Sequence, residues 1–516
     1  MTAITKLRFI SPRSWTNNEA YGLSRANDSY DGGMPRLPRS RPCAQEVDAR
    51  GFLSFLDAVE RSEIELHSLM ALRHGHVVAE GWWAPYAADR PHLLYSLSKS
   101  FTSMAVGIAI DEGLLRVNDG LLLHLVDFAP ADVDDRVRTI TVDDALRMAT
   151  GHLDDPIYSV ISWCSEHDDT EWLHGLFTMP PERAPGTVFA YNNMATYALA
   201  RIVQRATGQR LIDYLGPRLF EPLGITERLW MTDVNRHDWG FSGLHLTTES
   251  LAACGQLWLQ GGRWQDRQLV PADWLKAATS IQMRTDAAHR ANLRSAPEPD
   301  WATGYGYHFW LSRHGYRGDG AYGQFCLVLP ERDAVVVLTS ATERHQELLD
   351  LVWQHLLPAL GSPDPSSAPT TTAGALLTGD QELANRLAGL ALPVPTTGMQ
   401  GRPGLFTAGD SSAVSMVSTV LLRETEQDYA LELSLDGVAH TMPVGHGRWL
   451  AGQWPTEPPI PFVSAGGWDS GSFVVELRMI QTPHLLRIIL DPKTRTFDSH
   501  WREQPMHVPD HTVYAV

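Results

Sequence analysis

Cysteine is scarce in this chain, and the spacing of ligands that would suggest a metal site is missing. The 516 residues include four cysteines, Cys43, Cys164, Cys254 and Cys326, which stand far apart and form no Cys-x-x-Cys pair. Disulfide and zinc frameworks need clustered or regularly spaced cysteines, so we expect four free thiols in a reducing compartment. No His-Glu-x-x-His or comparable motif is present. We therefore expect neither a metal nor any other cofactor.

Long hydrophobic runs and a surplus of basic residues are also missing. No apolar stretch reaches the roughly 18 residues that a membrane span needs, and residues 1–10 lack the apolar core of a signal peptide. The formal net charge is −18, from 42 basic and 60 acidic residues, which offers no basic stripe for nucleic-acid phosphates. We expect a cytoplasmic protein with no nucleic-acid or membrane partner. Association into a homo-oligomer stays open.

The length of the chain predicts two domains, one large and one small. Residues 1–45 are rich in Pro, Arg, Ser and Asn and are expected to form an irregular N-terminal arm. Residues 46–361 mix strand and helix patterns, and residues 362–376 are a low-complexity linker. Residues 377–516 begin with one helical pattern and continue with short alternating segments, which are typical of a small β-barrel or sandwich.

Within residues 46–361, strand patterns at both ends enclose a run of helical patterns. Strands from the two ends could pair into one antiparallel sheet with helices packed on it, which predicts an α/β (α+β) domain with a helical flank. The expected strands of this domain span 68–73, 76–81, 304–311, 324–329 and 334–339. The expected helices span 48–61, 96–112, 141–150, 194–207, 247–260, 271–278 and 345–360. The small domain is expected to contain a helix over 381–392 and strands over 414–422, 429–435, 473–479 and 485–490.

The sharpest local motif is Ser96-Leu97-Ser98-Lys99, at the start of a helical pattern. Residues i and i+3 share a helix face, so Lys99 is expected beside Ser96. The helix N-terminus offers backbone N–H groups and the positive end of the dipole, which favour an alkoxide and a developing oxyanion. A desolvated lysine with a lowered pKa can remove the proton of a serine hydroxyl. Because Ser-x-x-Lys also occurs by chance in a chain of this length, it needs support from other motifs.

A second motif, Tyr191-Asn192-Asn193, stands directly before a helical pattern. Tyr191 could relay a proton to or from Ser96, and Asn193 could donate to Lys99 and to a substrate carbonyl. The same residues could equally be an asparagine N-cap with a buried tyrosine beside it.

The third motif, Gly318-Asp319-Gly320-Ala321-Tyr322, leads into a strand pattern. Glycines at such a place permit a ligand to approach the backbone closely. The N–H of Ala321 could then join that of Ser96 as the second oxyanion donor, and we assign Asp319, Gly320 and Tyr322 to the same substrate and oxyanion region. The alternative is a glycine-rich hairpin turn without a function.

In order and spacing the three motifs together resemble the class C β-lactamase superfamily, over about residues 48–360. That family has the fold of penicillin-binding proteins and includes D-alanyl-D-alanine carboxypeptidases, esterases, D-amino-acid amidases and nylon-oligomer hydrolases. The resemblance implies that Ser96 is the acylated nucleophile, Lys99 its base, Tyr191 a proton relay and Asn193 an orienting residue. It also implies a small-molecule ester or amide substrate, cleaved through an acyl-enzyme. A Gly-x-Ser-x-Gly elbow, which would indicate an α/β-hydrolase, is absent.

One departure from the family concerns the third motif. Members that bind penicillins carry Lys-Thr-Gly or His-x-Gly there, whereas this chain has Gly318-Asp319-Gly320. An anionic substrate group would face Asp319 with no lysine to offset it, although Arg317 or His314 could substitute. We therefore expect an esterase, amidase or peptidase rather than an efficient β-lactamase. Acyl transfer through the same acyl-enzyme, and a non-catalytic ligand-binding sensor on the same fold, are the alternatives.

Overall fold

The structure, a computed structural model, describes the chain in eight stretches: 37–290, 298–361, 373–395, 402–409, 412–414, 417–435, 437–456 and 459–506. Most of the predicted N-terminal arm and of the predicted linker lie outside these residues. The described end of the arm contains a short 3₁₀ helix, Pro42–Gln45, and the backbone N–H of Ser40 donates to the carbonyl of Val77 at 3.0 Å. This part of the arm therefore lies against the edge of the large domain.

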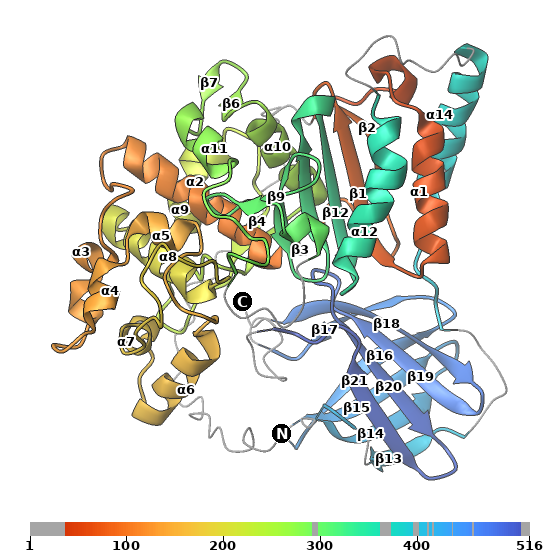
Figure 1. The fold of residues 1–516 in the computed structure, drawn as a ribbon. Helices are drawn as coiled ribbons and strands as arrows, with labels where there is room; N and C mark the ends of the chain where they lie inside the picture. The colour runs from red at the N-terminus through yellow and green to blue at the C-terminus, as the bar shows by residue number, and fades with distance from the viewer. Residues whose placement is uncertain are drawn as a thin grey trace.

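A seven-stranded antiparallel sheet forms the centre of the large domain (Figure 1). In spatial order its strands are β2 (His76–Trp82), β1 (Glu65–Arg73), β12 (Ala334–Ala341), β11 (Gln324–Leu329), β10 (Tyr316–Gly320), β9 (Trp310–Leu311) and β8 (Gly304–Tyr305). Strands from the two ends of the domain pair directly, β1 with β12, as the sequence predicts. The predicted single strand 304–311 is instead the hairpin β8–β9, because His308 adopts a left-handed backbone conformation that breaks it.

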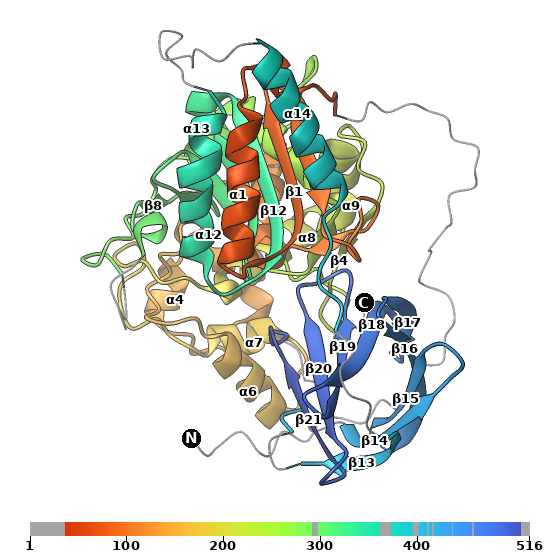
Figure 2. The same ribbon diagram turned by 90° about the vertical axis from the view of Figure 1, so that its right-hand side faces the viewer.

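Helices cover both faces of this sheet (Figure 2). Side chains alternate along β1, so Leu69 and Ala71 pack into one core while Met70 and Leu72 pack into the other. The helices on the first face are α1 (Ala49–Arg61), α12 (His345–Leu351) and α14 (Ala373–Ala388), and those on the second are α2 (Ser98–Asp111) and α10 (Thr248–Leu259).

The helix that follows Ser96, α2, is buried around its whole circumference. Residues Ser98–Ala109 are all buried, because the helix runs between the sheet and the helical flank. Small residues permit this close packing: a Cβ atom on Gly107 would lie 2.3 Å from the indole ring of Trp274. The residues at the start of α2 are therefore fixed by packing on every side.

The helical flank packs on the second face of the sheet, beyond α2 (Figure 1). The predicted helix 141–150 is shorter in the structure, since Met148 has a left-handed conformation. None of the helices among the described residues combines the length and apolar character needed to cross a bilayer. The flank consists of α3 (Leu121–Leu125), α4 (Asp135–Thr139), α5 (Val142–Leu146), α6 (Ile157–His167), α7 (Trp172–Phe177), α8 (Asn193–Thr207), α9 (Leu211–Leu215) and α11 (Ala272–Ala278).

The C-terminal domain is a β-barrel, which settles the choice between barrel and sandwich. Its sheet closes because β16 pairs with β18, at Gly445 opposite Ala465. Alternate residues of β15 point inward, as the sequence predicts for a barrel strand. The strands are β13 (Gly404–Ala408), β14 (Val417–Glu424), β15 (Tyr429–Leu435), β16 (Val438–His446), β17 (Leu450–Trp454), β18 (Ile460–Asp469), β19 (Ser472–Arg478), β20 (Leu485–Asp491) and β21 (Thr496–Trp501).

The helix predicted at the start of the C-terminal domain belongs to the large domain. α14 begins at Ala373, inside the predicted linker, and packs beside α1 and β2 (Figure 2). Its residues Leu383 and Leu387 join the same core as Phe52 of α1. The structure thus places this helix on the large domain's sheet, whereas the sequence pattern assigned it to the unit after residue 377.

Candidate active site

The structure brings Ser96 and Lys99 together at the N-terminal end of α2. Ser96 lies in a single 3₁₀ turn, Tyr95–Leu97, which leads directly into the helix. Its side chain is partly exposed, whereas Lys99 is only 1 % exposed. The Nζ atom of Lys99 lies 3.0 Å from Oγ of Ser96. The serine can therefore meet a substrate while the lysine stays out of solvent.

Lys99 has two further hydrogen-bond partners, and both can only accept. Nζ lies 2.6 Å from Oδ1 of Asn193 and 2.9 Å from the carbonyl oxygen of Phe241. A neutral amine has two N–H groups and one lone pair. If both N–H groups are used by these two oxygens, the lone pair faces Ser96 and can receive the proton of its hydroxyl.

Burial favours this neutral form of Lys99. Desolvation lowers the pKa of Lys99 from 10.5 to about 7, and the negative charges of Asp155 and Asp319 oppose part of that shift. A lysine at its ordinary pKa would be almost wholly charged at neutral pH. Here the neutral base is well populated under those conditions.

Asn193 is oriented by a carboxylate that sequence reasoning missed. Its Nδ2 donates to Oδ2 of Asp155 at 2.7 Å, and its backbone N–H donates to Oδ1 of the same residue at 3.1 Å. Because a carboxylate must face the amide nitrogen, the amide oxygen points to Lys99. Asn193 thus accepts from Lys99, and the expectation that it donates to Lys99 is wrong. Burial raises the pKa of Asp155, partly offset by these hydrogen bonds and by Lys99.

The sequence left open whether the second motif serves the site or caps a helix, and the structure shows one asparagine in each role. Asn192 is the N-cap of α8, and its side chain accepts from the N–H of Ala195 at 2.9 Å. Asn193 begins the helix and faces Lys99. The only sequence signal for Asp155 was its place in an acidic pair, Asp154-Asp155, before a helix. No sequence signal marks the backbone carbonyl of Phe241.

Tyr191 lies over the same centre. Nζ of Lys99 is 4.7 Å from the centroid of the Tyr191 ring. Burial raises the pKa of Tyr191 well above its ordinary value, and the neighbouring Ser96 hydroxyl only partly offsets that shift. The ring is stacked with Trp310 at a centroid distance of 6.0 Å and an angle of 11°. Tyr191 is therefore a fixed, protonated hydroxyl beside the serine.

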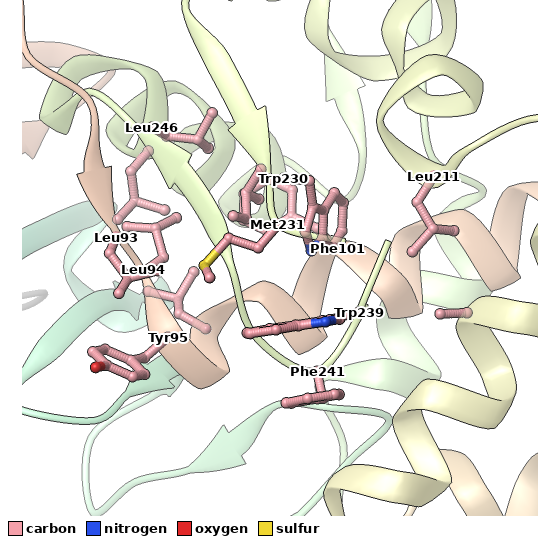
Figure 3. Packing of buried hydrophobic residues seen from close by; sticks show 14 of the residues in the cluster. Leu93, Leu94, Tyr95, Phe101, Leu211, Trp230, Met231, Trp239, Phe241 and Leu246 are labelled. Carbon is pink, nitrogen blue, oxygen red and sulfur yellow. The ribbon is translucent and has the colours of Figure 1, made fainter. Parts of the chain in front are cut away.

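An aromatic pair supports the loop that supplies the Phe241 carbonyl. The rings of Trp239 and Phe241 are stacked at 5.5 Å and 4° (Figure 3). Between them Gly240 has a φ of 71°, and a Cβ atom there would lie 2.5 Å from Cβ of Ala200. The hydroxyl of Thr102 in α2 donates to the Gly240 carbonyl at 2.8 Å. The loop is thus anchored to the helix that carries Lys99.

The glycines of the third motif allow β10 to lie against the Ser96 turn. A Cβ atom on Gly320 would lie 2.1 Å from the carbonyl oxygen of Leu94, and one on Gly318 would lie 3.0 Å from Cγ of Leu97. A side chain at Gly320 would collide with the backbone of this turn, whereas one at Gly318 would require the Leu97 side chain to shift by a few tenths of an ångström. Ala321, one residue past the end of β10, is partly exposed and adjoins the same turn.

Of the two cations that could substitute for the missing lysine, Arg317 is the one that the structure places beside Asp319. Nε of Arg317 lies 2.8 Å from Oδ2 of Asp319, because residues i and i+2 of β10 share a face. The guanidinium is fully buried and also donates to the carbonyl of Asp300 at 2.9 Å. His314 is exposed at the opposite end of β10, near Trp353, and does not replace the lysine of the third motif.

This ion pair predicts a loss of stability when Asp319 is removed. Asp319→Ala would leave the Arg317 guanidinium buried without its carboxylate, and we expect the free energy of unfolding to fall by about 3 kcal/mol. Urea denaturation of the large domain measures this loss. The matched double variant Arg317→Met/Asp319→Ala should lose clearly less, because no buried charge remains. Equal stability of Asp319→Ala and the unmodified protein would contradict the assignment.

The side chain of Tyr322 points away from the Ser96 centre. Its hydroxyl donates to the carbonyl oxygen of Gln504, beyond the last strand of the barrel, and the residue is 6 % exposed. Only its backbone, next to Ala321, adjoins the predicted oxyanion region. The assignment of the Tyr322 side chain to substrate binding is therefore corrected to a contact with the barrel.

A family model and two curated relatives match part of this chain. A model of the Beta-lactamase family matches residues 59–357, more than half of the chain. The 6-aminohexanoate-dimer hydrolase of Paenarthrobacter ureafaciens is 27% identical over 291 residues, which are 53% of this chain and 72% of that protein. The lovastatin esterase of Penicillium rubens is 28% identical over 200 residues, 34% of this chain and 49% of the esterase.

Among solved structures, the one named "Putative 6-aminohexanoate-dimer hydrolase from Bacillus anthracis" superposes with a TM-score of 0.50 at 18% sequence identity. The superposed region covers 64% of this chain and 88% of the chain of that solved structure. At this identity the likeness concerns the fold alone, and it agrees with the arrangement of sheet and helical flank described above.

Proposed function

Because the chain belongs to the Beta-lactamase family, we propose that it is a serine hydrolase that cleaves an ester or amide through an acyl-enzyme on Ser96. The observation that carries the proposal is the set of partners around Lys99. Its Nζ is 3.0 Å from the Ser96 hydroxyl, and its other two partners are oxygens that cannot donate. Such an arrangement suits a base and has no evident use in a module that only binds a ligand.

In the proposed acylation step, neutral Lys99 takes the hydroxyl proton while Oγ of Ser96 attacks the substrate carbonyl carbon. The carbonyl oxygen becomes negative and accepts hydrogen bonds from the N–H groups of Ser96 and Ala321. When the tetrahedral intermediate collapses, the bond to the alcohol or amine breaks and the leaving group takes a proton from the Tyr191 hydroxyl. The Lys99 ammonium restores that proton, so that the net transfer is from Ser96 to the leaving group.

Deacylation repeats these steps with water as the nucleophile. Lys99, neutral again, removes a proton from a water molecule while the water oxygen bonds to the acyl carbon. The bond between that carbon and Oγ of Ser96 then breaks, Oγ takes the proton from the Lys99 ammonium, and the acid product leaves. The raised pKa of Tyr191 keeps its hydroxyl protonated, so it can pass on a proton that Lys99 restores but is not available as the base that activates water.

The charges around the site favour substrates without a carboxylate at the third motif. The Arg317 guanidinium is fully buried and its Nε is paired with Asp319, so it presents no exposed cation to a substrate anion. Asp155 and Asp319 add negative charge around Lys99. We propose uncharged esters or amides bearing an amine, which agrees with the names of the dimer hydrolase and the esterase among the relatives.

A substrate panel tests the proposal. The protein should hydrolyse p-nitrophenyl esters and amino-bearing amides at least about tenfold faster than penicillins, since a penicillin carboxylate meets no free cation at the third motif. Intact-protein mass spectrometry during ester turnover should show one acyl adduct on Ser96. If neither hydrolysis nor an acyl adduct is detected, the proposed function is wrong. Efficient penicillin hydrolysis would overturn the substrate class while leaving the mechanism standing.

A further inference from the structure

The barrel contacts the chain beside both proposed oxyanion donors. Tyr95 immediately precedes Ser96, and its hydroxyl lies 2.7 Å from Nε2 of His484, between β19 and β20. Tyr322 immediately follows Ala321, and its hydroxyl donates to the carbonyl of Gln504. The C-terminal domain thus holds a neighbour of each donor, although the two donors come from distant parts of the sequence.

The hydrogen bonds of His484 define its protonation state. Its Nδ1 lies 2.8 Å from the carbonyl oxygen of Glu503, and a carbonyl can only accept, so Nδ1 carries the proton. Burial lowers the pKa of His484 to about 3, which keeps the imidazole neutral. Nε2 therefore carries no proton and accepts from the Tyr95 hydroxyl. The direction of this contact is fixed by the barrel backbone.

Three rings meet edge to face at this point. Tyr95 and Tyr322 lie 5.5 Å apart at 71°, and each also meets the His484 ring at close to a right angle, at 5.9 Å and 5.7 Å. Each ring is at most 6 % exposed. Because aromatic rings prefer this geometry and the space around them is filled, a shift of one ring moves the others.

Both tyrosines also have a backbone conformation that needs support. Tyr95 has a φ of 50° and Tyr322 a φ of 61°, in the left-handed region that bulky residues avoid. Such conformations persist where the surrounding structure imposes them, and they gather at functional sites. The peptide group between Tyr95 and Ser96 carries the Ser96 N–H, and Tyr322 holds the chain directly after Ala321, so the two tyrosines flank the two N–H groups that must point at one oxygen.

We propose that His484 is a positioning residue for the reaction: through Tyr95 and Tyr322 it fixes the backbone N–H groups of Ser96 and Ala321 in the geometry that binds the oxyanion. The inference rests on the proposed function, since it needs an oxyanion to stabilise. It gives the barrel a role in the chemistry of the large domain. His484 exerts this role through the two tyrosines.

Steady-state hydrolysis of a p-nitrophenyl ester by the full chain tests this role. His484→Phe and Tyr95→Phe each remove one partner of the 2.7 Å contact and keep a ring in place. We expect kcat to fall about tenfold or more in each with KM nearly unchanged, because oxyanion donors act mainly in the transition state. The double variant should be no worse than either single one. His484→Gln, whose amide oxygen can take the place of Nε2, should restore part of kcat.

Tyr86→Phe is the matched control. It removes another tyrosine hydroxyl of the same interface, which donates to the carbonyl of Thr482 at 3.2 Å, two residues from His484. Its kcat should equal that of the unmodified protein. In parallel, affinity for phenylboronic acid, whose adduct with Ser96 is tetrahedral, should fall in Tyr95→Phe and not in Tyr86→Phe.

The possible outcomes separate the two proposals. Unchanged kcat in Tyr95→Phe and His484→Phe, or an equal loss in Tyr86→Phe, overturns the positioning role. If His484→Phe fails to fold by thermal unfolding, Tyr95→Phe decides, since it loses one hydroxyl only. If the unmodified protein hydrolyses no ester, the proposed function fails before the variants are compared.

Discussion

Ser96→Ala is expected to abolish turnover, with a loss of about 10⁴-fold or more in kcat, because alanine has no hydroxyl that could form the acyl-enzyme. Covalent labelling by a fluorophosphonate, and the acyl adduct seen by mass spectrometry, should disappear together with activity. The fold should persist, since Lys99 keeps its contacts with Asn193 and the Phe241 carbonyl. Assays of turnover, fluorophosphonate labelling and thermal unfolding on the same preparation test the expected loss of activity, the loss of labelling and the intact fold.

Ser103→Ala is the matched control for this substitution. Ser103 lies in the same helix, is fully buried, and its hydroxyl has no hydrogen-bond partner among the described residues. The variant should therefore keep the activity and labelling of the unmodified protein. Wild-type turnover in Ser96→Ala would show that the mechanism is wrong, and loss of labelling in both variants would show that labelling does not report on Ser96.

The pair Ser96 and Lys99 could be predicted because its geometry is local. A spacing of three residues on a helix brings the two side chains together whatever the rest of the chain does. Asn193 was predicted as well, since it stands next to a recognisable helix start. Asp155 was not, because its contact with Asn193 depends on the packing of the flank, and the Phe241 carbonyl could not be, because any residue type supplies one.

In the fold too, elements with a local sequence pattern were predicted and elements that depend on distant contacts were not. Strands β1, β2, β11 and β12 of the central sheet were predicted from continuous apolar or alternating patterns, whereas β10 was not, because its glycines are typical of a turn before a strand. In the barrel, β18 was missed because Pro461, Gly466 and Gly467 read as turn residues. The structure shows that one of these glycines serves packing, since a Cβ atom on Gly466 would lie 2.8 Å from Val444 where β16 and β18 close the barrel. Contacts between distant segments, such as Tyr95 with His484, leave no local pattern.

The pH dependence of acylation follows from the lowered pKa of Lys99. The active form of a base is the deprotonated one, so its population rises with pH through the pKa, which lies at about 7 here. We expect kcat/KM for ester hydrolysis to rise about tenfold between pH 6 and pH 8 and then level off. A lysine at the ordinary pKa of 10.5 would give a rate still rising at pH 9. If kcat/KM does not rise with pH near pH 7, the role of Lys99 as the base is contradicted.

Lys99→Arg separates this role from simple charge. Arginine keeps a positive group near Ser96 but cannot lose its proton in this pH range, so we expect kcat/KM to fall about a hundredfold or more, nearly as far as in Lys99→Ala. The rising limb near pH 7 should vanish in both variants. Lys276→Arg, the same exchange at an exposed lysine of α11, is the control and should leave rate and profile unchanged. Substantial activity of Lys99→Arg would mean that Lys99 acts only through its charge, since a guanidinium that holds its proton cannot accept one from Ser96.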